Sequence, residues 1–252
     1  MLENLEPKIV WYILKILLLK LRDLSKHEER IREVIKDFIL ESGKTNNNDF
    51  QIYQDGVGNI LIKKPATSGQ ESIPSIMLQA HLDMVCETDK PEGFDFFNKG
   101  IPVRIQENNE WVYADGTSLG ADNGIGLAFA LAILIDKSID SHGPIEVLFT
   151  VNEEDGFDGA THLDPKTLNI KSKLMINLDG GPAEVVVIGS VCGRRVRFSK
   201  KFNWISPENI EDFSNRLTSN NIPNWYVGII DKKEPGLVRL SKNIEFEEVL
   251  KK

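Results

Sequence analysis

The sequence predicts an α/β fold in which a mixed sheet is flanked by helices, and three patterns support this prediction. Short apolar runs, typical of buried strands, occur at 76–78, 144–151 and 174–178. The segment 127–134 is apolar on nearly all sides, so we expect it to form a buried helix. Each of the three runs is followed by His or acidic residues, and ligand sites in open α/β sheets lie at such strand ends.

Composition and charge limit the possible partners and the compartment. The 252 residues suffice for one large domain or two small ones, and a net charge of -8 argues against a nucleic-acid partner. The two cysteines, Cys86 and Cys192, form no CxxC pattern, as expected in a reducing compartment. The apolar run 10–19 contains Lys15 and is shorter than the roughly 20 residues that span a bilayer. We therefore expect a cytoplasmic protein with no membrane or nucleic-acid partner.

Two helices are expected near the N-terminus. Apolar residues recur at helical spacing through 7–24, which predicts the first helix. Ser25 and Glu28 have the spacing of a capping box, so the second helix should begin there and end near Gly43.

Two hairpins are expected between these helices and the buried helix at 127–134. The runs 50–54 and 59–63 flank Asp55-Gly56, which is a turn signal for a hairpin. The short runs 103–105 and 111–113 predict a second, smaller hairpin.

The pattern changes from about Lys200, after two further expected strands. Further strands are expected at 184–188 and 194–198. Beyond these, the expected elements are a helix at 207–217 and strands at 225–230 and 237–240. We therefore divide the chain into residues 1–199 and a short C-terminal α/β segment, residues 200–252.

His81 and Asp83 follow the strand predicted at 76–78. Alternate residues of an extended segment face the same side, so the two side chains should lie together. A His beside a carboxylate suits a metal ligand and the partner that orients it. The simpler alternative is a surface His-Asp pair.

Four more carboxylates accompany the other predicted elements. Glu153 and Glu154 end the run 144–151, Asp179 ends the run 174–178, and Asp122 opens the buried helix. Each has a simpler structural alternative, either a helix cap or a turn. Together they would place one His and several carboxylates at one sheet edge, where their charges repel unless a cation offsets them. Mixed His and carboxylate ligands of this kind suit zinc, and an acid-rich site can bridge two metal ions. Of two adjacent Glu residues, one can bind metal while the other acts as a general base.

Several segments carry a family resemblance. HLDM at 81–84, LGADNGIG at 119–126, TVNEEDGFDGA at 150–160 and NLD at 177–179 resemble the co-catalytic dizinc metallopeptidases. Within that family the sequence is most similar to the aminoacyl-histidine dipeptidases, also called peptidase D, over roughly residues 8–198. The resemblance implies a three-layer catalytic domain with a mixed, mostly parallel sheet between helices.

The resemblance also implies roles for the six residues. His81 and Asp179 would bind one zinc, Glu154 would bind a second, and Asp122 would bridge both; Mn²⁺ or Co²⁺ could replace Zn²⁺. Glu153 would be the general base and Asp83 would orient His81. The substrate would be a small peptide, and the reaction would be the hydrolysis of dipeptides of the Xaa-His type.

The sequence departs from this family in its second half. The family has a lid domain and then a return segment with a further His ligand, whereas the last of the four His here is His162. We therefore expect a truncated peptidase with the lid missing or reduced, at most one retained zinc, and weak or lost activity. His162 is a possible substitute ligand. The alternative function is a non-catalytic metal-binding or interaction module, or a fragment of a dipeptidase; no oligomeric state is indicated.

Overall fold

The computed structural model describes residues 2–20, 27–46, 49–108, 110–180 and 185–188, together with the backbone of two short strands, 229–230 and 238–239. The chain divides into two compact units, Met1–Ser190 and Val191–Lys252. In the second unit, β8 (Ile229–Ile230) pairs antiparallel with β9 (Val238–Arg239), within the two strands predicted there. The strand predicted at 194–198 and the helix at 207–217 lie outside the described residues.

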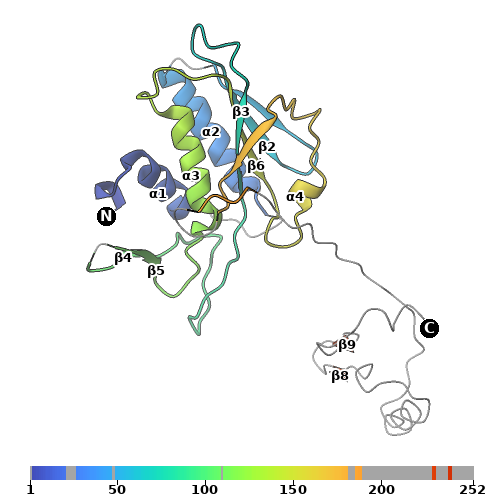
Figure 1. Cartoon of the computed structure of the whole chain (residues 1–252). Helices are drawn as coiled ribbons and strands as arrows, with labels where there is room; N and C mark the ends of the chain where they lie inside the picture. Colours follow the sequence, from blue (N-terminus) through green and yellow to red (C-terminus); the bar gives the residue numbers. More distant parts are fainter. Residues whose placement is uncertain are drawn as a thin grey trace, which may run out of the picture. The chain divides into compact units, whose positions relative to one another are not determined.

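A mixed five-stranded sheet forms the centre of the first unit (Figure 1). The strand order is β1-β2-β6-β3-β7; β1, β2 and β6 pair antiparallel, whereas β6, β3 and β7 pair parallel. In this sheet β2 therefore opposes the common direction of the other four strands, which confirms the predicted mixed, mostly parallel arrangement. The bounds are β1 Gln51–Gln54, β2 Ile60–Lys64, β3 Ile76–His81, β6 Ile145–Thr150 and β7 Leu174–Asn177.

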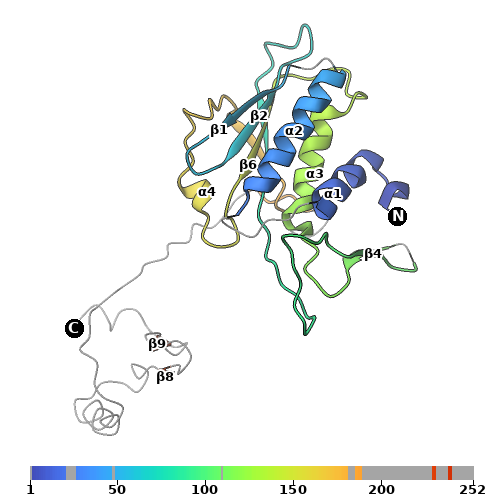
Figure 2. The same ribbon diagram turned by 180° about the vertical axis from the view of Figure 1, so that it is seen from behind.

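Three helices cover one face of the sheet, as Figure 2 shows from behind. They are α1 (Lys8–Lys20), α2 (Glu29–Asn46) and α3 (Ala121–Ile135). The helix α3 is apolar nearly all round and is buried between the sheet and its neighbours, as predicted. The sequence predicted that this helix ends near Gly43, but α2 continues through that glycine to Asn46. The capping residue predicted at Ser25 lies outside the described residues.

The opposite face carries a thinner layer. The four-residue helix α4 (Asp158–Thr161) lies on the side of the sheet away from α1–α3 (Figures 1 and 2). The segment after it packs a small apolar cluster against the sheet, formed by Leu61, Met77, Leu148 and Leu168. The predicted position of the sheet between helices is therefore confirmed. Within the described residues, no helix combines the length and the apolarity that crossing a membrane needs.

The strand register determines which side chains meet at the sheet edge. In the parallel pair β3–β6, His81 is opposite Thr150, so the residues after each strand emerge at the same edge. In the parallel pair β3–β7, Gln79 is opposite Asn177, which brings Asp179 to that edge as well. Parallel neighbours end on the same side of a sheet, which is where open α/β folds bind their ligands.

The two predicted hairpins form, but one predicted strand does not. β1 and β2 pair around the Asp55-Gly56 turn, and β4 (Val103–Ile105) pairs antiparallel with β5 (Val112–Ala114). The strand predicted at 184–188 is wrong for its described residues: Val185, Val186, Val187 and Ile188 belong to no strand and are 56% to 98% exposed. Among the described residues no strand pairs with this run, so it joins no ladder of hydrogen bonds.

Candidate metal centre

His81 is the last residue of β3 and is almost completely buried. Its Nδ1 lies 3.0 Å from the backbone carbonyl oxygen of Asp83 and 3.3 Å from the Asp83 carboxylate. Its Nε2 lies 2.9 Å from Asp122 Oδ1 and 3.9 Å from Asp179 Oδ2. With Nδ1 donating to Asp83, the ring orientation is fixed and Nε2 is the nitrogen available to a cation.

Asp83 has no exposed surface, and its carboxylate joins two strands. Oδ1 accepts the backbone N–H of Glu153 at 2.9 Å, and Oδ2 accepts that of Glu154 at 3.1 Å. A buried carboxylate requires such donors because desolvation of the charge is otherwise costly. Asp83 therefore lies beside His81, as the sequence predicted, and it also holds the turn that carries the two glutamates.

Asp122 lies in the first turn of α3, but it does not cap the helix. Asp122 (φ -81°, ψ 110°) and Asn123 (φ -106°, ψ 34°) both have non-helical dihedrals, so the regular helix begins only after them. This extended backbone interrupts the helix at its start, and the Asp122 carboxylate contacts His81. The hydrogen bond of this carboxylate thus goes to the imidazole of His81 and not to a backbone N–H of the helix, as a cap would require.

The six residues singled out from the sequence come together at this edge. Ligand atoms of His81, Asp122 and Asp179 lie within 4.8 Å of one another, and so do those of His81, Glu153 and Glu154. The two groups share His81, and among the described residues no other His belongs to either group. His162 is exposed at the end of α4, where its Nδ1 faces the Asp158 carbonyl oxygen, so the structure does not bring it into the cluster.

The charges of the cluster fit a divalent cation. Burial disfavours the protonated ring of His81, but hydrogen bonds to Asp83 and Asp122 and the charges of Asp83 and Asp179 outweigh it and raise its pKa to about 9. Burial, assisted by the neighbouring carboxylates, raises the pKa of both Glu153 and Glu154. Carboxylates that repel one another in this way are stabilised by a proton or by a metal ion. One imidazole with several carboxylates is a donor set that suits zinc and related cations.

Sequence reasoning missed two buried polar residues that support the turn after β6. Asn59 Oδ1 accepts the N–H of Val151 at 3.1 Å, and Glu28 Oε1 accepts the N–H of Asn152 at 2.8 Å. Glu28 fits a capping-box pattern, so its local spacing indicated a helix start rather than a contact with β6. A buried polar residue of this kind has no local signal, because its partner is 124 positions away.

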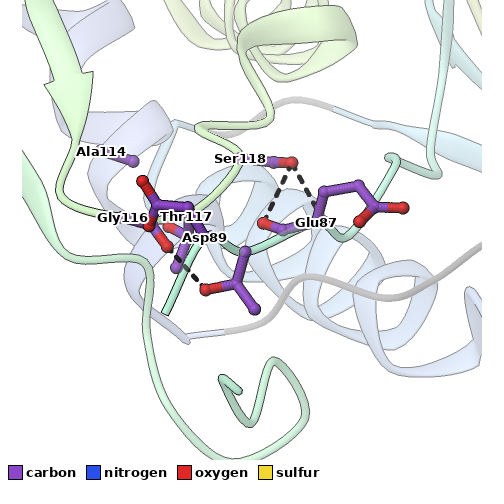
Figure 3. Close-up of a pocket in the computed structure, with 7 residues that line it drawn as sticks. Glu87, Asp89, Ala114, Gly116, Thr117 and Ser118 are labelled. Carbon is purple, nitrogen blue, oxygen red and sulfur yellow. Dashed lines mark hydrogen bonds between the residues drawn. The ribbon is translucent and has the colours of Figure 1, made fainter. Parts of the chain in front are cut away.

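A polar pocket is lined by residues that do not belong to the cluster. It has a volume of about 430 Å³ and lies between the loop at 87–89 and the segment 114–118 (Figure 3). Ser118 hydrogen-bonds to the backbone of Glu87, and Thr88 Oγ1 donates to the Gly116 carbonyl oxygen. None of its lining residues is one of the six described above, so we place the candidate site at the sheet edge and not in this pocket.

The chain is similar to known peptidases. The model of peptidase family M20/M25/M40 matches residues 77–248. The chain is 41% identical over 192 residues to the cytosol non-specific dipeptidase of Escherichia coli (strain K12), covering 76% of this chain and 37% of that protein.

Solved structures of peptidases are also similar to the chain. The aminoacylhistidine dipeptidase of Vibrio alginolyticus aligns with a TM-score of 0.64 and 39% identity, covering 71% of this chain and 34% of that one. The aminopeptidase PepT of Bacillus cereus aligns with a TM-score of 0.54 and 27% identity, covering 69% of this chain and 44% of that one. The chain thus spans between about a third and a half of the length of these relatives.

Proposed function

The chain belongs to peptidase family M20/M25/M40, and from this membership we propose that it hydrolyses small peptides with the help of a divalent cation at the sheet edge. The observation that carries the proposal is the convergence of His81 with two pairs of acidic residues, each group within 4.8 Å. Carboxylates gathered around a buried imidazole repel one another, and this repulsion destabilises the fold unless a cation offsets their charge.

We assign the cation ligands to His81, Asp122, Asp179 and Glu154. His81 offers Nε2, since its Nδ1 faces Asp83. Asp122 is the carboxylate nearest to that nitrogen, and Asp179 approaches it from the segment after β7. A bound cation in such a site acts as a Lewis acid that polarises a peptide carbonyl and favours deprotonation of water.

Glu153 is the residue we assign as the general base. Its backbone is held by Asp83, and burial raises the pKa of its carboxyl, which brings it closer to neutral pH. A base works best when its pKa lies near the working pH. Glu153 takes a proton from the attacking water as the new C–O bond forms. It then donates that proton to the amine nitrogen as the C–N bond breaks.

The proposed substrates are dipeptides, including the Xaa-His type. Support comes from the similarity to a protein named aminoacylhistidine dipeptidase and to one named cytosol non-specific dipeptidase. We also propose a cytoplasmic location, because the E. coli relative is a cytosolic protein by name. Separation of cells into cytosol and membrane fractions, with detection of the native chain, tests that location.

We propose that the chain retains one tightly bound cation and that its turnover is weak. The two acidic groups share His81, so a second cation would have only carboxylate ligands among the described residues. Elemental analysis of dialysed protein tests this number. One zinc per chain is expected, and two retained zincs would contradict it.

A second candidate function is that of a non-catalytic metal-binding module. The single shared imidazole favours it, because a poorly held second cation would leave binding without efficient chemistry. An assay of purified chain with Zn²⁺, Mn²⁺ or Co²⁺ on Xaa-His and other dipeptides separates the two functions. Turnover that depends on Glu153 supports the peptidase. Stoichiometric metal binding with no turnover supports the module.

A further inference from the structure

The turn after β6 has an unusual set of backbone contacts. Three successive N–H groups each donate to a buried carboxylate. That of Asn152 donates to Glu28 Oε1 at 2.8 Å, and those of Glu153 and Glu154 donate to the two oxygens of Asp83 at 2.9 and 3.1 Å. Hydrogen bonds to a charged acceptor are about twice as strong as neutral ones, so each N–H direction is strongly preferred.

Asn152 gives the turn its shape. Its φ of 50° lies in the left-handed region, which asparagine adopts more readily than most residues, and it is 2% exposed. Its Nδ2 donates to the Asp155 carbonyl oxygen at 3.1 Å and to Asp158 Oδ2 at 2.6 Å. The side chain is therefore hydrogen-bonded to other residues of the turn, whereas the backbone N–H donates to Glu28 outside it.

Glu28 attaches this turn to the helical layer. It directly precedes α2 and is 3% exposed. The helix behind it is anchored in the core by Ile31, Ile35 and Ile39, none of which has exposed surface. A buried carboxylate just before this helix thus accepts the N–H of the residue that comes directly before the two glutamates of the candidate site.

We propose that Glu28 is a positioning residue, which acts through Asn152 to fix the direction in which the turn presents Glu153 and Glu154 to His81. The inference rests on the proposed function, because it assigns those two residues to the base and to a cation ligand. Glu28 itself belongs to neither group of potential ligands. It affects the chemistry only by fixing the position of the turn.

Variants of Glu28 in the full chain test this role. Glu28→Gln keeps a carbonyl acceptor for the Asn152 N–H, whereas Glu28→Leu removes it. A misplacement of about 1 Å can cost about 100-fold in rate, so we expect kcat of Glu28→Leu to fall about 10- to 100-fold while KM changes little. Glu28→Gln should restore kcat to within a few-fold of the wild type. If Glu28→Leu does not fold, Glu28→Asp replaces it, since the shorter side chain draws the turn away and should lower kcat about 10-fold.

The matched control is Ile39→Val, which removes a buried methyl group about three turns further along the same helix. It should lower Tm and leave kcat unchanged. A kcat loss in Ile39→Val as large as that in Glu28→Leu would show that Glu28 serves stability alone and would overturn the proposal.

Two readouts do not depend on turnover. In the metal-free chain, amide hydrogen exchange at 152–154 should be at least about 10-fold faster in Glu28→Leu than in the wild type or Glu28→Gln, because the bond that protects this turn is lost. Co²⁺ affinity should fall in parallel, since Glu154 is displaced. Unchanged exchange and Co²⁺ affinity in Glu28→Leu would overturn the inference. Absence of dipeptide turnover in the wild type would overturn the proposed function, while these two measurements would still decide the role of Glu28.

Discussion

The Asp83 carboxylate accepts the backbone N–H of Glu153 at 2.9 Å and thereby joins the end of β3 to the end of β6. The same carboxylate lies 3.3 Å from Nδ1 of His81. One buried group thus fixes the imidazole that faces the cation site and the turn that carries the proposed base. Loss of its charge should disturb both.

Asp83→Asn should lower both activity and stability. An amide can accept only one of the two N–H groups and turns its own donor toward the other, which leaves a buried donor unsatisfied at a cost of about 1–3 kcal/mol. We expect kcat to fall about 100-fold, as for a misplacement of about 1 Å. Kinetics and urea unfolding measure the two effects. Asp115→Asn is the control, because Asp115 is 61% exposed and pairs only at the surface with Arg104. An Asp83→Asn protein with wild-type values would contradict this assignment.

Cation binding should release a proton from His81. In the metal-free chain its pKa is raised to about 9, chiefly by bonds to Asp83 and Asp122 that outweigh the effect of burial. The ring is therefore protonated at pH 7.5, and a cation must displace that proton. Affinity should weaken about tenfold for each pH unit below 9. Calorimetric titration of Zn²⁺ at pH 7.5 in buffers of different ionisation enthalpy should give about one proton released per cation. Release should persist in His162→Asn, and no release in the wild type would rule out His81 as the ligand.

Gly126 provides a steric test of the Asp122 position. A Cβ at this glycine would overlap the side-chain oxygen of Asn123, which is buried and directly follows Asp122. Gly126→Ala should therefore displace this segment, lower stability by about 1–3 kcal/mol and weaken Zn²⁺ binding. Gly56→Ala is the matched control, since nothing lies within 4 Å of a Cβ there. Equal Zn²⁺ affinity in both variants would show that the start of α3 does not contribute to the site.

The Lys63–Glu146 pair should stabilise the fold without affecting the site. The two groups are 2.8 Å apart, with side chains 14% and 3% exposed. Burial opposes ionisation of Glu146, but Lys63 and the backbone N–H groups of Lys171 and Ser172 outweigh it and lower the pKa of that carboxyl. This stability is therefore present above the ordinary carboxyl pKa and is lost as pH falls through the lowered value in the folded chain.

Glu146→Gln should destabilise the chain by about 3 kcal/mol at pH 7, as when one partner of a buried pair is removed, and by less at pH 3. Urea unfolding at the two pH values measures the difference. Glu33→Gln, which breaks the more exposed contact with Lys36, should cost under about 1 kcal/mol. A Glu146→Gln effect that is the same at both pH values would show that the carboxylate charge does not contribute.

Local patterns predicted most of the framework of this site. Apolar runs located β3, β6 and β7, and the residues that follow them, such as His81 and Asp179, therefore share one edge. The contact between Glu28 and Asn152 was not predictable, because it joins residues 124 positions apart and depends on the packing of α2. The wrong strand at 184–188 shows the same limit. Its apolar residues satisfy a strand pattern, but strand formation also needs a neighbour.

The most direct test of the account compares Glu153→Gln with Glu154→Gln in one experiment that measures both zinc content and dipeptide turnover. Glutamine keeps the shape of each side chain but cannot accept the proton. We predict that Glu153→Gln retains the zinc of the wild type and loses about 10²–10⁴-fold in turnover, the usual cost of removing a general base. Glu154→Gln should lose zinc first and turnover with it. Wild-type turnover in Glu153→Gln at full zinc content would contradict the assignment of Glu153 as the base.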